Sequence, residues 1–217
     1  MATKKRTKNT GQGSLFVAPE TPDAFRKAVQ ILHSKPKRPM GLMERKIADN
    51  WLKRASREDP DTKGWWTVHI SEMAQEIGFD SNNSEYLKKA AGELMQIVFE
   101  WDVIASQEKR ITWKASVLFP EVEIENTLLR FQVSSQLLAQ VRNPAVYAFI
   151  DESISRRFRR GPTFAIYQHC FRFVKVGKTS EVKWETFRDM ILGESAGASS
   201  YSEYKYFKAK VLKPAIA

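Results

Sequence analysis

The sequence has a single cysteine among its 217 residues. Cys170 therefore has no partner for an intramolecular disulfide, and with its neighbour His169 it offers only two of the ligands that a metal site needs. Proteins without disulfides are typical of the cytosol, where thiols are kept reduced. We expect no disulfide, no metal site and a cytoplasmic location.

Long apolar runs are also missing. No stretch approaches the roughly 20 apolar residues that are needed to span a bilayer. Residues 1–13 are polar and basic, and no apolar segment of the kind found in signal peptides follows them. We therefore expect neither membrane insertion nor secretion.

The sequence contains few of the residue patterns that mark common classes of enzyme. His33, His69 and His169 are isolated from one another, so the near-adjacent histidines of metal-dependent nucleases are missing. The full Gly-rich loop that ends in Gly-Lys-Ser/Thr and cradles nucleotide phosphates is missing as well. We expect no enzymatic activity and no cofactor.

What the sequence does have is core-forming material and positive charge. Hydrophobic residues make up 42% of the chain, which is enough for one large domain or two small ones. The 35 Lys and Arg exceed the 25 Asp and Glu by 10, and the sequence pI is about 9.7. Such an excess favours a polyanionic partner.

The positive charge is unevenly placed. Residues 1–12 carry four basic and no acidic side chains, residues 13–144 carry 18 of each, and residues 145–217 carry 13 basic and 7 acidic ones, which together give +4, 0 and +6. The sequence therefore predicts a basic disordered tail at 1–20, an electrically neutral first domain at 21–143 and a basic second domain at 144–217.

Turn residues and apolar spacing divide the first domain. The elements that they predict are a helix from Asp23 to His33, a proline-containing linker at 35–39, a helix from Gly41 to about Ala55, a strand at 65–70, helices at 71–77 and 84–95 around a turn at 80–83, β-type runs at 97–103, 110–119 and 129–133, and a helix that ends near Val141. Two short helices joined by a turn and followed by a hairpin are typical of a winged helix. Pro144 marks the expected boundary.

The second domain repeats a helical order. Its predicted elements are a β-type run at 146–150, a helix after Gly161 whose buried face includes Phe164 and Val174, a helix that begins after Ser180 and ends at Gly193, a flexible segment at 194–200, and a last helix from about Tyr201. We therefore expect an α+β, mainly helical chain with two winged-helix domains.

The last helix is the main candidate for DNA contact. Tyr204, Phe207, Val211 and Ala215 share one face, which predicts its core side. The candidate DNA-binding residues on and beside the opposite face are Ser202, Lys205, Tyr206, Lys208, Ala209, Lys210 and Lys213. Lysines bind phosphates, while small and amphipathic side chains can approach base edges. The alternative is an ordinary solvated helix.

Two further groups are candidates for phosphate contact. One is the run Arg156, Arg157, Arg159 and Arg160, because guanidinium groups bind phosphate bidentately. The other is the pair Lys88 and Lys89 on the helix at 84–95. For both groups the alternative is a solvated surface.

Several segments in this order resemble the iteron-binding plasmid replication initiators, the tandem winged-helix Rep proteins. The segments are Leu42–Leu52, Ile77–Lys88, Ala165–Gln168, Phe187–Gly193 and Tyr204–Ile216. The resemblance implies a plasmid-encoded bacterial protein that binds direct repeats of a replication origin as a monomer. It also implies homodimers, formed through the first domain, that bind an operator inverted repeat and repress the protein's own gene.

The resemblance implies that the helix at 201–216 reads DNA, and that the host initiator and replicative helicase are recruited through protein contacts. Family members carry a wing hairpin after this helix, whereas the printed sequence ends at Ala217. Either the sequence is a fragment that stops before this wing, or the second domain lacks it; in both cases we expect the second winged helix to be truncated here. A winged-helix transcriptional regulator without an initiator role is the alternative function.

Overall fold

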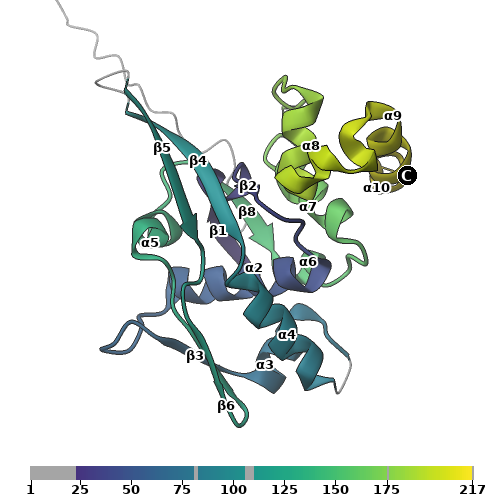
Figure 1. Cartoon of the computed structure of the whole chain (residues 1–217). Helices are drawn as coiled ribbons and strands as arrows, with labels where there is room; N and C mark the ends of the chain where they lie inside the picture. The colour runs from purple at the N-terminus through teal and green to yellow at the C-terminus, as the bar shows by residue number, and fades with distance from the viewer. Residues whose placement is uncertain (1–22, 81–82, 106–109, 175, 217) are drawn as a thin grey trace, which may run out of the picture.

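The computed structural model describes residues 23–80, 83–105, 110–174 and 176–216 (Figure 1). The tail expected at residues 1–20 lies outside the described residues. Helices and strands both occur along the chain, and the expected mixed character is confirmed. Within the described residues from 161 onward every element is helical, so the second winged helix stays a prediction.

Helix α2 (Leu42–Arg57) lies at the centre of the molecule (Figure 1). It begins where the Gly41 amide donates a 2.6 Å hydrogen bond to Oε2 of Glu44, which supports the first turn. On its apolar side Trp51 is fully buried, stacks on Phe131 at 4.6 Å between ring centroids and meets Phe119 edge-on at 4.8 Å. The helix predicted from Gly41 is confirmed.

A winged helix is built on this side of α2. Its elements are β3 (Trp66–His69), α3 (Ile70–Ile77), α4 (Ser84–Leu94), β6 (Val122–Glu125) and β7 (Leu128–Phe131). The three strands form an antiparallel sheet in the order β3-β7-β6. The helix-turn-helix order is confirmed, and Gly78 ends α3 in a left-handed conformation (φ 66°) as expected.

The wing is the hairpin of β6 and β7, which turns tightly at Asn126 (φ 55°). Strand β6 has no counterpart in the sequence-based prediction. The longer hairpin of β4 (Val98–Ala105) and β5 (Arg110–Val117) forms a separate sheet with β2 (Lys35–Pro36). The segment expected to be a linker at 35–39 therefore contains an edge strand.

The prediction of a helix from Asp23 to His33 is wrong. Ala24–Ala28 form strand β1, and only Val29–Leu32 form a helical turn, α1. β1 pairs antiparallel with β8 (Tyr147–Asp151), with Phe25 opposite Ile150. Pairing with a segment more than a hundred residues away decides the conformation here over the local pattern.

The described residues contain two apolar cores. The first core joins α2 to the winged helix and α5 (Ser135–Arg142), and it also takes in Ala148 and Ile150 of β8. The second core lies among α7 (Gly161–Phe171), α8 (Trp184–Leu192) and the last helical segment. The division of the chain at residues 143 and 144 stays a prediction; the structure adds that β8, which follows it, packs into the first core.

A buried polar layer separates the two cores. On the polar side of α2, Asp49 accepts hydrogen bonds from Lys27 of β1 and from Gln168 of α7. Farther along α2, Lys53 and Asn50 both bond the Glu152 carboxylate of α6 (Glu152–Ser155). Pairing of this kind is required because an unpartnered buried charge costs several kcal/mol.

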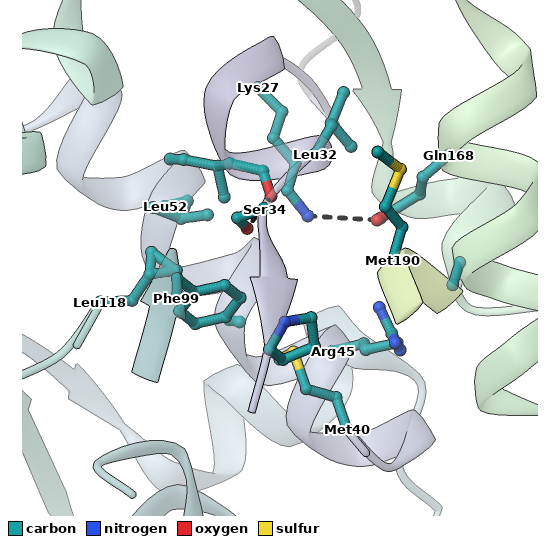
Figure 2. Close-up of a pocket in the computed structure, with 14 residues that line it drawn as sticks. Lys27, Leu32, Ser34, Met40, Arg45, Leu52, Phe99, Leu118, Gln168 and Met190 are labelled. Carbon is teal, nitrogen blue, oxygen red and sulfur yellow. Dashed lines mark hydrogen bonds between the residues drawn. The ribbon is translucent and has the colours of Figure 1, made fainter. Parts of the chain in front are cut away.

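A small pocket lies in this layer (Figure 2). Its volume is about 40 Å³, which is room for a few water molecules. Lys27 and Gln168, joined by a 3.1 Å hydrogen bond, lie at one side, and Phe99 and Leu118 line another (Figure 2). At the same junction Nη2 of Arg45 donates to the Ile191 carbonyl of α8 at 2.7 Å. Side chains from both halves of the chain thus meet around one cavity.

Candidate nucleic-acid interface

The last helical segment runs from Tyr204 to Ile216 and is called the final helix below. It consists of α9 (Tyr204–Phe207), the π-helical turn η3 (Lys208–Leu212) and α10 (Lys213–Ile216). Phe207 and Val211 are buried in the second core, as the spacing predicts. Tyr204, expected on the core side, is 45% exposed, and the helix begins at this residue and not at Tyr201.

The opposite side of the final helix is open to solvent. Six of the seven candidate residues of this segment are exposed: Ser202, Lys205, Lys208, Ala209, Lys210 and Lys213. Tyr206, the seventh, is half-buried and lies beneath two lysines, with Nζ of Lys205 at 4.9 Å and Nζ of Lys210 at 5.6 Å from its ring centroid. Ser202 precedes the helix, in the 3-10 turn η2 (Ser200–Ser202). The predicted face is therefore accessible.

Helix α8 holds the final helix in place. Trp184 meets Tyr204 edge-on at 5.5 Å, and Phe187 meets Phe207 at 6.4 Å between ring centroids. Buried Arg188 donates to the Tyr201 carbonyl at 3.3 Å and lies 5.4 Å from the centre of the Trp184 ring. The segment expected to be flexible at 194–200 forms 3-10 turns, η1 (Glu194–Ala198) and the start of η2, against this arginine.

The structure separates the members of the arginine run. Arg156 is half-buried, and its Nε donates to the Glu76 carbonyl at the end of α3. The Lys46 ammonium donates to the Ile77 carbonyl at 3.3 Å, so two cations meet the C-terminus of that helix, where the helix dipole favours positive charge. Arg157, Arg159 and Arg160 are exposed in the connection between α6 and α7.

The lysines of α4 are paired. Nζ of Lys88 lies 2.7 Å from the Glu85 carboxylate, and Nζ of Lys89 lies 3.8 Å from that of Glu93. In each pair the lysine and the glutamate are one helical turn apart. Each glutamate therefore lowers the positive potential that a phosphate would meet. The structure thus brings the candidate lysines of the first winged helix next to acids.

Sequence reasoning missed the chemistry of the wing. Glu121, Glu123 and Glu125 are exposed on and beside β6, and Arg130 of β7 pairs with Glu123 at 3.0 Å. We call Glu121, Glu123 and Glu125, with β6, the acidic wing. The alternation of Glu with Val122 and Ile124 is the period of a half-buried strand and could have identified it.

Two histidines lie at the junction between α1 and α7. The rings of His33 and His169 are 4.5 Å apart between centroids, and Nη1 of Arg172 lies 3.4 Å from Nε2 of His33. Burial lowers the pKa of His169 to about 4, and the neighbouring Arg172 acts in the same direction. Burial, His169 and Arg172 lower the pKa of His33 to about 4. Both rings are therefore neutral at pH 7.

Comparison with protein families identifies the family to which this chain belongs. The family model described as initiator replication protein, WH1, matches residues 25–171, which is more than half of the chain. The chain belongs to this family. No curated protein matches it. Among solved structures, the WH1 domain of a replication protein isolated from a multiple sclerosis patient is similar, with 14% identity, a TM-score of 0.34, and coverage of 46% of this chain and 78% of that one.

Membership of the initiator family makes the chain a replication initiator with a WH1 winged helix. Initiators of this family act primarily by binding DNA and are not enzymes in the usual sense. In the part of the chain that the structure describes, no helix combines the length and the apolar character needed to cross a bilayer.

Proposed function

We propose that this initiator binds directly repeated sequences of a plasmid origin, with the final helix in the major groove. The observation that carries the proposal is the exposed lysine face of that helix, which is anchored to the second core through Phe207 and Val211. A helix whose buried side packs on a core can present cations on its exposed side to phosphates at fixed positions. The exposed Arg157, Arg159 and Arg160 supply further phosphate contacts, while Arg156 supports α3.

The proposal extends to regulation. In it, monomers bind the origin repeats, homodimers formed through the first domain bind an operator inverted repeat and repress the gene, and protein contacts recruit the host initiator and helicase in the cytoplasm. Membership of the initiator family and the resemblance of the segments named above support this part. The neutral charge of residues 13–144 also suits a domain that contacts protein.

The lysine face is tested by salt dependence. Lys205→Ala and Lys213→Ala should each weaken binding to an origin duplex and reduce the slope of log K against log salt by up to about 1. Fluorescence anisotropy over a salt series measures both quantities. Lys63→Ala, an exposed lysine before β3, is the matched control and should leave the slope unchanged. Unchanged slopes in both test variants would place the final helix away from DNA.

Origin complementation separates an initiator from a transcriptional regulator. A plasmid that carries the cognate origin and lacks its own initiator gene should replicate when this protein is supplied in trans. Replication should be lost in the double variant Lys205→Ala/Lys213→Ala. Failure of the wild-type protein to support replication, with operator binding intact, would favour the regulator.

A further inference from the structure

The arginine run and the final helix carry their positive charge on different chemical groups. Residues 156–160 contain four arginines and no lysine, whereas residues 201–217 contain four lysines and no arginine. A lysine ammonium is compact and strongly hydrated, while a guanidinium is planar and more weakly hydrated. Lysines therefore suit phosphates at the surface of a duplex, and arginines suit sites where a cation must shed water.

The exposed arginines have no partner within the protein. Among the residues that the structure describes, the side chains of Arg157, Arg159 and Arg160 form no ion pair and no hydrogen bond. Phe158, the apolar residue between them, is half-buried, so the segment presents guanidinium groups without an apolar patch. A surface of this kind fits a polyanion better than an amphipathic protein segment, and the initiator family binds DNA.

The backbone of this segment is held at three points. Arg156 donates to a carbonyl at the end of α3. The Phe158 ring stacks on Phe164 at 5.1 Å between centroids. A Cβ atom at Gly161 would lie 3.1 Å from the backbone nitrogen of Leu42, so the chain passes close to the start of α2. The exposed arginines between these points therefore extend from a fixed position.

Helix α7 connects the arginines to the final helix. Arg160 directly precedes α7, and Ala165 and Ile166 pack in the second core, which also holds the final helix. Val174, which the sequence predicts on this buried face, lies beyond the end of α7 and is exposed. Figure 1 shows α7 and the final helix together on the right side of the molecule. DNA that binds the final helix therefore passes near the exposed arginines.

The two grooves of a duplex admit different elements. The major groove accepts a helix, while the minor groove is only about 6 Å wide and accepts arginine side chains from a neighbouring segment. We propose that Arg157, Arg159 and Arg160 enter the minor groove beside the major groove that the final helix occupies, and favour A·T base pairs there. A narrow A·T minor groove has a stronger negative potential, and guanine adds an amino group to its floor.

This inference rests on the proposed binding of the final helix in the major groove. It deepens that function, because it assigns the exposed arginines to a groove and to a class of base pair. Two probes on a duplex that carries one origin repeat separate the two contacts. Dimethyl sulfate reports protection of guanine N7 in the major groove, and hydroxyl radicals report protection of sugars along the minor groove.

The first experiment removes the guanidinium groups. Arg157→Ala/Arg159→Ala/Arg160→Ala should lose hydroxyl-radical protection over one stretch of minor groove and keep the protection of guanine N7. Unchanged hydroxyl-radical protection overturns the proposal and leaves the arginines to a protein partner. A wild-type protein that leaves guanine N7 unprotected contradicts the proposed function, and this inference falls with it.

The second experiment changes the base pairs of that stretch to A·T, to I·C or to G·C. An I·C pair resembles A·T in the minor groove and G·C in the major groove. The wild-type protein should bind the A·T and I·C duplexes equally and the G·C duplex about fivefold or more weakly. Arg157→Lys/Arg159→Lys/Arg160→Lys should keep the slope of log K against log salt, because its charge is unchanged, and should bind the three duplexes alike.

The control is Arg142→Lys, which replaces an exposed arginine of α5 that pairs with Asp59. Figure 1 shows α5 on the left side of the molecule, and this variant should keep the wild-type preference. Circular dichroism checks that all variants fold. Equal wild-type affinity for the three duplexes, or a preference that survives the replacement of the three arginines by lysine, overturns the proposal.

Discussion

Helix α4 and the final helix both carry lysines on an exposed side, yet their surroundings differ. Each candidate lysine of α4 has a glutamate one turn away, at 2.7 Å and 3.8 Å. On the final helix Lys205 pairs with Glu203 at 2.9 Å, and among the described residues Lys208, Lys210 and Lys213 form no ion pair. We therefore expect the final helix to attract phosphate more strongly than α4 does, because fewer of its lysines are offset by an acid.

The same contrast extends to the wings and the cores. The first winged helix has an acidic wing, which would repel phosphate, and a large core that fixes its own fold. The final helix depends on a small core of few residues. We infer that the first winged helix contributes stability and contacts with protein. The final helix supplies positive potential and is supported by a smaller apolar core.

The largest effect is expected from removing that support. Phe207→Ala deletes a fully buried ring and should lower the free energy of unfolding of the second core by about 3–5 kcal/mol. Urea unfolding, followed by tryptophan fluorescence, measures the loss. Tyr204→Ala on the same helix removes a half-exposed ring and is the control, with a cost of less than about 1 kcal/mol. Equal costs would show that the two aromatic rings share one environment.

An intermediate effect is expected where the two halves of the chain meet. The lowered pKa of His169 means that the unfolded chain binds a proton before the folded one does. Stability is therefore full above pH 6.5 and falls as the pH drops from 6.5 to about 4. His169→Phe should reduce this fall by about 3 kcal/mol, because the pKa of His169 is lowered from 6.5 to about 4 and each pKa unit corresponds to roughly 1.4 kcal/mol. Urea titrations at several pH values measure it.

The control for this pH dependence is His69→Phe, which replaces an exposed histidine at the end of β3. This variant should keep the wild-type slope of stability against pH. A His169→Phe slope equal to that of the wild type would contradict burial of the ring against α1.

The smallest effect is expected on α4. Because Glu85 and Glu93 already offset their charges, Lys88→Ala/Lys89→Ala should weaken binding to an origin duplex by less than about threefold. The loss should be clearly smaller than that of the double variant Lys205→Ala/Lys213→Ala in the same anisotropy assay. A larger loss from the α4 variant would reverse the comparison.

Helices with strong periodicity and glycine ends could be predicted from the sequence. The apolar spacing after Gly41 corresponds to α2, which begins at Leu42. Gly78 and Gly193, which the sequence predicts to end helices, directly follow α3 and α8. The exposed lysine face could also be predicted, because Phe207 and Val211 set the orientation of the helix. These features depend on neighbours within a few turns.

Features that depend on distant segments could not be predicted. Residues 24–28 have helical spacing but become a strand through pairing with β8. The polar side of α2 looks solvated in sequence, whereas Asp49 and Lys53 are buried beneath α6 and α7. The role of Arg156 at the end of α3 likewise arises from an approach across 80 residues of chain.

Gly193 carries a consequence for sequence comparison. It follows α8 with φ 86°, and a Cβ atom at this position would lie 2.6 Å from the carbonyl carbon of Arg38. Any side chain would meet backbone that cannot move aside, so the contact between α8 and the segment before α2 tolerates glycine alone. Glycine at this position is thus a one-letter marker by which related sequences with the same arrangement of their two halves can be recognised.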